Sequence, residues 1–260
     1  MAKKEQLREI RRGLIINRTS KREDKQCEKV VKSVLFSLEN EFGVKIEWKK
    51  RIYLKDIITF LREKFPNVEF ADPEKSSSFM TPDGGISFLI DKSGSKYPIL
   101  IAEVKNQGTN DLRAKEGKKK QAQGNAVERL GKNVIGFKTY MLNESIFPFV
   151  CFGDGCDFEK GSSILDRVLT IAMFGKMNTD HTFNEGKNGI FNRGSYYFRS
   201  EYWTAGEMED ILHEVAKRSI YYYFSKYGEG SFRDVKLQDI NKSTQSGSKI
   251  AEDDSPLYTG

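Results

Sequence analysis

The spacing of apolar residues along the chain predicts helices that are interspersed with short strands. Apolar residues recur at helical spacing in five stretches, which we expect to be helices: about 22–42, 53–65, 119–142, 163–174 and 207–227. Continuous apolar runs typical of buried strands occupy three further stretches: 86–90, 97–104 and 146–152. Strands placed between helices in this way favour one α/β domain, with a central sheet covered on both faces.

The charge and composition narrow the class of protein. The 260 residues carry a formal net charge of +6 and have a pI of about 9.0, which favours an anionic partner such as nucleic acid. Three cysteines and two histidines are too few for a disulfide framework or a His-rich zinc site. Any metal would therefore be held mainly by carboxylates, as Mg²⁺ is. Because no run of 18 apolar residues and no apolar leader occurs, we expect no membrane association.

The two ends of the chain differ in composition from its middle. Residues 1–33 contain eleven Lys or Arg against five Asp or Glu, and the stretch after residue 241 is rich in Ser, Gly, Thr and Asp. We therefore expect a basic arm over 1–21, one domain over 22–240 and a disordered tail over 241–260.

Two carboxylates and a lysine are the candidate catalytic groups. Glu103 and Lys105 are two residues apart at the end of the predicted strand 97–104, so they project from the same face of the sheet. Asp83 precedes the neighbouring strand of the predicted hairpin and is expected to come close to both. Two carboxylates supply part of the oxygen shell that Mg²⁺ accepts, and a lysine can orient or deprotonate an attacking water. This arrangement suits phosphodiester hydrolysis.

A structural ion pair between Glu103 and Lys105 is the alternative interpretation. Six Asp/Glu-x-Lys triplets occur in the chain, and five of them lie in polar or helical surroundings typical of surface charge pairs. Only Glu103 lies in an apolar run, where a charge is costly unless it is paired or functional.

A second candidate segment, Gln121-Ala-Gln-Gly-Asn-Ala-Val-Glu-Arg129, follows a basic loop and opens a predicted helix. Asn and Arg side chains can bond the edges of adenine and guanine in the major groove. Taken alone, the pattern fits equally well with Asn125 as an ordinary helix N-cap and with Glu128 and Arg129 as surface charges.

Three motifs together resemble the EcoRI-type restriction endonucleases of the PD-(D/E)xK nuclease superfamily. They occur in the family's order and spacing: Thr81-Pro-Asp-Gly-Gly85, Ala102-Glu-Val-Lys-Asn-Gln-Gly108 and Gly124-Asn-Ala-Val-Glu-Arg129. The resemblance covers most of residues 80–175. It implies a central mixed five-stranded sheet flanked by helices in a single domain. It also implies a type II endonuclease that acts as a homodimer on palindromic double-stranded DNA, in the cytoplasm of a prokaryotic cell that makes a cognate DNA methyltransferase.

The resemblance further implies roles for individual residues. Asp83, Glu103 and the backbone carbonyl of Val104 would hold Mg²⁺, and Lys105 would be catalytic. The segment beginning at Gly124 would bind an AATT core, with Glu128 and Arg129 also coupling the two subunits. The residues expected at the DNA are Gln107, Gln121, Ala122, Gly124, Asn125, Ala126, Glu128, Arg129, Lys132 and Arg167.

The chain departs from the family pattern near groups associated with the outer base pairs and with phosphate binding. Gln121-Ala-Gln123 replaces a Met-Ala-Ala sequence, Thr109 replaces a lysine, and Arg167 stands where a pair of arginines is typical. We therefore expect GAATTC-like sites that share the AATT core, cut to leave 5′-phosphates and 5′ overhangs. Two alternatives are a structure-selective repair or recombination nuclease, and a DNA-binding module whose carboxylates only form ion pairs.

Overall fold

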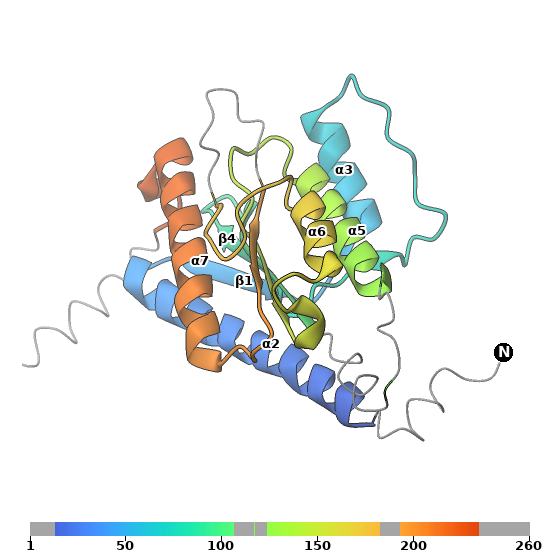
Figure 1. The fold of residues 1–260 in the computed structure, drawn as a ribbon. Coiled ribbons are helices and arrows are strands. Elements are labelled where there is room, and N and C mark those ends of the chain that lie inside the picture. The colour runs from blue at the N-terminus through green and yellow to red at the C-terminus, as the bar shows by residue number, and fades with distance from the viewer. Residues whose placement is uncertain (1–13, 107–116, 118–123, 183–192, 234–260) are drawn as a thin grey trace, which may run out of the picture.

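A computed structural model of the chain shows a sheet between two layers of helices (Figure 1). The structure describes residues 14–106, 117, 124–182 and 193–233, with side chains except at 14–22, 124–126 and 156. Its helices are α2 (Leu14–Phe42), α3 (Leu54–Lys64), α5 (Gly124–Tyr140), α6 (Ser163–Ile171) and α7 (Ala205–Tyr227). Its strands are β1 (Lys45–Lys49), β2 (Ile52–Tyr53), β3 (Phe79–Met80), β4 (Gly85–Ile90), β5 (Lys96–Asn106), β6 (Phe149–Asp154) and β7 (Ser195–Phe198).

Five of the strands form one mixed sheet in the order β1-β4-β5-β6-β7, and β2 pairs with β3 separately. Strand β4 pairs antiparallel with both β1 and β5, whereas β5, β6 and β7 run parallel to one another. The central strand β5 is buried from Pro98 to Val104, as its apolar sequence requires. The α/β fold with a mixed five-stranded sheet is therefore confirmed.

Helices cover both faces of the sheet. Helices α2 and α7 pack against each other and against β5 on one side, while α5 and α6 lie together on the other, with α3 beside α5 (Figure 1). Large side chains fill the space between these layers, and Phe88, Phe137, Phe149 and Tyr196 are among those with almost no exposed surface. This packing on both faces fixes the positions of the strand ends, including the carboxyl end of β5, where the candidate catalytic residues lie.

The end of β5 is also tied to β6 and to the loop that leads into α7. The Asn106 amide donates to Asp154 Oδ1 over 2.8 Å, and the backbone N–H of Trp203 donates to Oδ2 of the same carboxylate over 3.4 Å. The Arg199 guanidinium lies 3.7 Å from the centre of the Trp203 ring and donates to both carboxylate oxygens of Glu207. These contacts fix the strand end directly after Lys105.

Some element boundaries differ from those that the sequence predicts. Helix α2 begins at Leu14, so the last residues of the segment expected as an arm are helical, while residues 1–13 and 241–260 lie outside the described residues. Strands β1, β2, β3 and β7 were not predicted from the apolar pattern. None of the helices in the described part of the chain is long and apolar enough to cross a membrane.

Candidate active site

Strands β4 and β5 bring the three candidate catalytic side chains together. Gly85 pairs with Ala102 in the antiparallel register, which places Asp83, just before β4, beside Glu103 on β5. Glu103 and Lys105 lie on either side of the buried Val104 on that strand and project from one face, as predicted. The site therefore forms where the hairpin meets the carboxyl end of the central strand.

Hydrogen bonds join these groups into one cluster. The Lys105 ammonium donates to Asp83 Oδ2 over 3.3 Å, to the Val104 carbonyl over 2.8 Å and to Glu103 Oε1. The Val104 N–H donates to Asp83 Oδ2 over 3.1 Å, and the Asp83 N–H donates to Glu103 Oε2 over 3.2 Å. Each carboxylate is thus held by backbone as well as by lysine.

Burial makes the charges of this cluster depend on one another. The side chain of Glu103 is 3% exposed and that of Lys105 is 15% exposed. Burial raises the pKa of Glu103, the positive charge of Lys105 opposes that shift, and the negative charge of Asp83 adds to it. Burial alone would lower the pKa of Lys105, but the two carboxylates outweigh it and raise the pKa, so the lysine stays protonated at neutral pH.

Two donors on the other side of the cluster hold the turn that carries Asp83. The Lys50 ammonium donates to the Asp83 carbonyl and the Trp48 indole N–H donates to the Gly84 carbonyl, each over 2.9 Å. Lys50 also donates to Glu28 on helix α2 over 2.9 Å. Sequence reasoning did not identify Trp48 or Lys50, because only the folded chain brings the β1 region to this turn.

The two glycines after Asp83 are required by close packing. A Cβ at Gly84 would lie 2.7 Å from Ala102 Cβ and 2.8 Å from Cys27 Sγ. Gly85 has a φ of 80°, and a Cβ there would lie 2.5 Å from Trp48 Nε1. The Pro-Asp-Gly-Gly sequence therefore lets the turn pass between helix α2 and strand β1.

We expect Gly85→Ala to destabilise the protein by more than the conformational cost alone, which is about 1–3 kcal/mol for a non-glycine residue at positive φ. The added Cβ must also displace Trp48. Gly94→Ala is the matched control, since Gly94 has a φ of 86° and no atom within 4 Å of an added Cβ. Urea denaturation of both variants measures the difference, and equal losses of stability would contradict the packing argument.

A further carboxyl group, that of Asp24 on helix α2, lies in the electrostatic field of the cluster. Burial and the negative charge of Asp83 raise the pKa of Asp24 to about 6, against the opposing charges of Lys105 and Lys50. Sequence reasoning did not single out Asp24 because it lies in the charged stretch Lys21–Lys25 of the helix.

Helix α5 also reaches the cluster, through Asn133. Its side-chain amide donates to Glu103 Oε1 over 3.2 Å. Asn133 lies within the range of the resemblance, but no role follows for it from the sequence. The contact joins the catalytic candidates to the helix that begins with the predicted DNA-binding segment.

The oxygen atoms at the cluster fit a hard metal ion. The Asp83 carboxylate, the Glu103 carboxylate and the Val104 carbonyl all accept from the same Lys105 ammonium, so these three oxygens already converge on one cation. They are the kinds of ligand that Mg²⁺ takes together with water. No group of three or more His, Cys, Asp or Glu suited to a metal occurs among the described residues.

The residues predicted to contact DNA are only partly placed. Gly124, Asn125 and Ala126 form the first turn of α5, without described side chains. The exposed members on the helices are Glu128, Arg129 and Lys132 on α5 and Arg167 on α6, the helix packed against α5. The remaining candidates lie outside the described residues: Gln107, Gln121 and Ala122.

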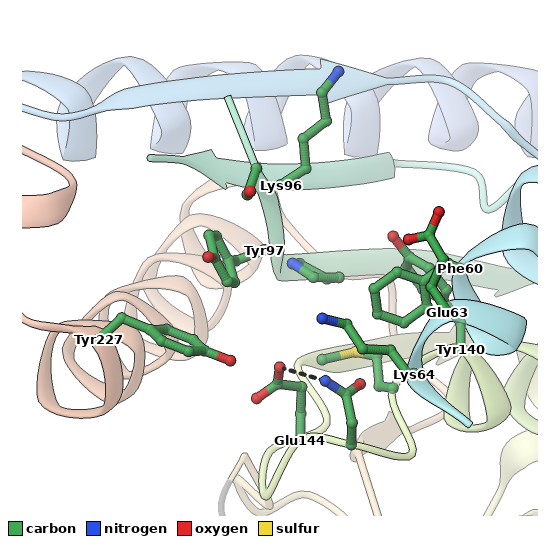
Figure 2. Close-up of a pocket in the computed structure, with 12 residues that line it drawn as sticks. Phe60, Glu63, Lys64, Lys96, Tyr97, Tyr140, Glu144 and Tyr227 are labelled. Atoms are coloured by element: carbon green, nitrogen blue, oxygen red, sulfur yellow. Dashed lines mark hydrogen bonds between the residues drawn. The ribbon is translucent and has the colours of Figure 1, made fainter. Parts of the chain in front are cut away.

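A pocket at the opposite end of β5 contains none of the candidate residues. Figure 2 shows that α3, the start of β5 and the ends of α5 and α7 surround it. Its walls include Phe60, Tyr97, Tyr140 and Tyr227. Because eight residues of β5 separate Tyr97 from Lys105, about 26 Å of strand lies between this pocket and the cluster.

The chain is similar in sequence to known restriction enzymes. The chain matches the family model described as "Restriction endonuclease EcoRI" over residues 12–164. It is 31% identical over 221 residues to the type II restriction enzyme RsrI of Cereibacter sphaeroides, covering 63% of this chain and 79% of that enzyme. It is 29% identical over 180 residues to the type II restriction enzyme EcoRI of Escherichia coli, covering 56% of this chain and 65% of that enzyme.

These matches and the α/β fold define a type II restriction enzyme, which is a site-specific deoxyribonuclease. The chain belongs to the EcoRI family of restriction endonucleases, because the family model covers more than half of it. Nucleases of this family are typically metal-dependent.

Proposed function

We propose that this enzyme is a homodimer that uses Mg²⁺ to cut palindromic DNA sites with an AATT core. The observation that carries the proposal is the cluster at the end of β5, where Asp83, Glu103 and Lys105 meet as the family motifs imply. The products would carry 5′-phosphates and 5′ overhangs, and GAATTC-like sequences are the expected sites.

In this proposal each group of the cluster has a separate task. Asp83, Glu103 and the Val104 carbonyl would hold Mg²⁺, which polarises a phosphate and lowers the pKa of a bound water. The protonated Lys105 would donate a hydrogen bond to the attacking water or to a phosphate oxygen. Its positive charge would offset the negative charge that develops in the transition state.

Recognition is assigned to the start of α5 and to the basic residues around it. The segment Gly124–Arg129 would bind the AATT bases in the major groove, while Lys132 and Arg167 would contact the phosphates. The basic segment 1–21 would add phosphate contacts, as a net charge of +6 favours. A palindromic site matches an isologous dimer, which presents the same helix start to each half-site.

The biological setting follows from the proposed reaction. The proposed enzyme would also cut its host's own DNA at AATT-containing sites unless those sites were methylated. We therefore expect a cognate DNA methyltransferase in the same bacterial cytoplasm.

Digestion of a plasmid of known sequence tests the proposal. We expect discrete fragments in Mg²⁺ and none in EDTA, with sequenced ends that carry 5′-AATT overhangs. Ends that lack AATT would refute the recognition assignment. Cuts confined to nicks or branched junctions would instead support a structure-selective nuclease, and binding without cuts would support a DNA-binding module.

A further inference from the structure

We propose that Asn133 is a positioning residue through which helix α5 sets the orientation of Glu103. This inference rests on the proposed function, since it concerns the carboxylate that is proposed to hold Mg²⁺. It assigns to Asn133 a link between the element that contacts DNA and the group that supports cleavage.

The contacts of Glu103 show why Asn133 differs from the other donors. Glu103 accepts hydrogen bonds from Lys105, from the Asp83 N–H and from Asn133. The first two donors belong to the site's own hairpin, so they move with it. Asn133 is the donor that belongs to another layer of the fold, and its 3.2 Å contact therefore fixes Glu103 relative to α5.

The charge of the donor matters as well. Lys105 and Asn133 both donate to Oε1, but Lys105 is also the group proposed to act on water or phosphate. A neutral amide can donate a hydrogen bond to a carboxylate oxygen without neutralising the negative charge that binds a metal ion. Donors of this kind around metal-binding carboxylates orient the ligand, and their loss typically costs about 10- to 100-fold in metal affinity or activity.

The position of Asn133 on α5 connects it to the predicted DNA-binding segment. It follows Asn125 by eight residues, which is about 12 Å along an α-helix. A helix transmits a shift at its first turn to positions two turns later because its backbone hydrogen bonds make it stiff. A displacement of α5 upon binding the correct DNA site would therefore act directly on Glu103.

Three variants of the full-length enzyme test the role of Asn133. Asn133→Asp keeps the shape of the side chain but replaces the donor with an acceptor and places a negative charge beside Glu103. Asn133→Leu removes the donor without adding charge, and Asn133→Gln keeps an amide. Asn143→Leu is the matched control, because Asn143 lines the distant pocket and donates to Glu144 over the same 3.2 Å.

The measurements are kcat at saturating DNA, the Mg²⁺ concentration that gives half of the maximal rate, the Kd for site DNA in EDTA, and Tm. For Asn133→Leu we expect kcat to fall about 10- to 100-fold or the half-saturating Mg²⁺ concentration to rise by that factor. Asn133→Asp should lose more, and Asn133→Gln should recover part of the loss. The Kd in EDTA should change by less than about threefold, with Tm as in the Asn143→Leu control.

The outcomes separate this inference from the proposed function. If wild-type enzyme cuts AATT sites with Mg²⁺ but Asn133→Asp cuts equally well, the positioning role is wrong and the proposed function stands. If activity falls only in step with Tm, Asn133 is structural and the inference is overturned. Failure of the wild-type enzyme to cut such sites would overturn the proposed function itself.

Discussion

Replacing Lys105 with methionine should reduce the rate of DNA cleavage by about 100- to 1,000-fold or more, which is the usual cost of losing one group that stabilises transition-state charge. Lys105 is the cation on which both carboxylates and the Val104 carbonyl converge, and its raised pKa keeps it charged. Methionine retains most of the alkyl chain, so the packing of the strand end is largely preserved.

Binding and stability measurements distinguish loss of catalysis from loss of structure. Site-specific affinity in the presence of Ca²⁺ should stay within a few-fold of wild type, because Ca²⁺ can neutralise Asp83 and Glu103 in place of the lysine. Lys92→Met is the control for loss of one positive charge, since Lys92 is exposed in the hairpin turn far from the cluster. Normal cleavage by Lys105→Met would remove Lys105 from the mechanism.

The core of the site could be predicted from the sequence because its charges interrupt an apolar pattern. Glu103 and Lys105 stand at the end of a strand that is buried from Pro98 to Val104, and Asp83 lies two residues before the neighbouring strand. Both signals are local, since the two strands are joined by a short turn. The structure then brings all three together through direct hydrogen bonds.

The surrounding donors could not be predicted, because their partners are distant in the sequence. Trp48 is 36 residues from Gly84, Lys50 is 33 residues from Asp83, and Asn133 is 30 residues from Glu103. Lys50 and Asn133 are residue types common on protein surfaces, Trp48 is a large apolar residue, and nothing in the local pattern marks any of the three as part of a site. Only the pairing of β1 with β4 and the packing of α5 give these side chains their role.

The same physical limit explains why the apolar pattern missed strands β1 and β7, in addition to the two-residue strands β2 and β3. Strand β1 lies at the edge of the sheet, and its Lys-Ile-Glu-Trp-Lys sequence is only partly buried, so it has no continuous apolar run. Strand β7 has four residues, all buried, which is too short for a periodicity to show. Helices α3 and α7 were predicted nearly to their ends, because an amphipathic repeat over several turns is a stronger signal.

Replacing Asn125 with alanine should reduce discrimination for the AATT core far more than it reduces non-specific DNA binding. A bidentate contact from asparagine to adenine contributes about 1–3 kcal/mol of discrimination. An isologous dimer makes the contact once in each half-site, so about 2–6 kcal/mol would be lost if the two contacts are independent. At 1.36 kcal/mol per factor of ten, that corresponds to about 30-fold to 30,000-fold.

The test compares Kd values for duplexes that differ at one adenine step or at both symmetry-related steps, with wild type and Asn125→Ala. For wild type, the second substitution should cost about as much as the first, and for the variant both should cost little. Lys132→Ala is the control, since loss of an exposed basic residue on α5 should weaken binding to all duplexes alike and lower the salt dependence. Equal discrimination by wild type and Asn125→Ala would remove the start of α5 from base recognition. If the wild-type Kd rises when one adenine step is changed but does not rise further when the symmetry-related step is also changed, the symmetric dimer is contradicted. The two half-sites would then be contacted by different surfaces.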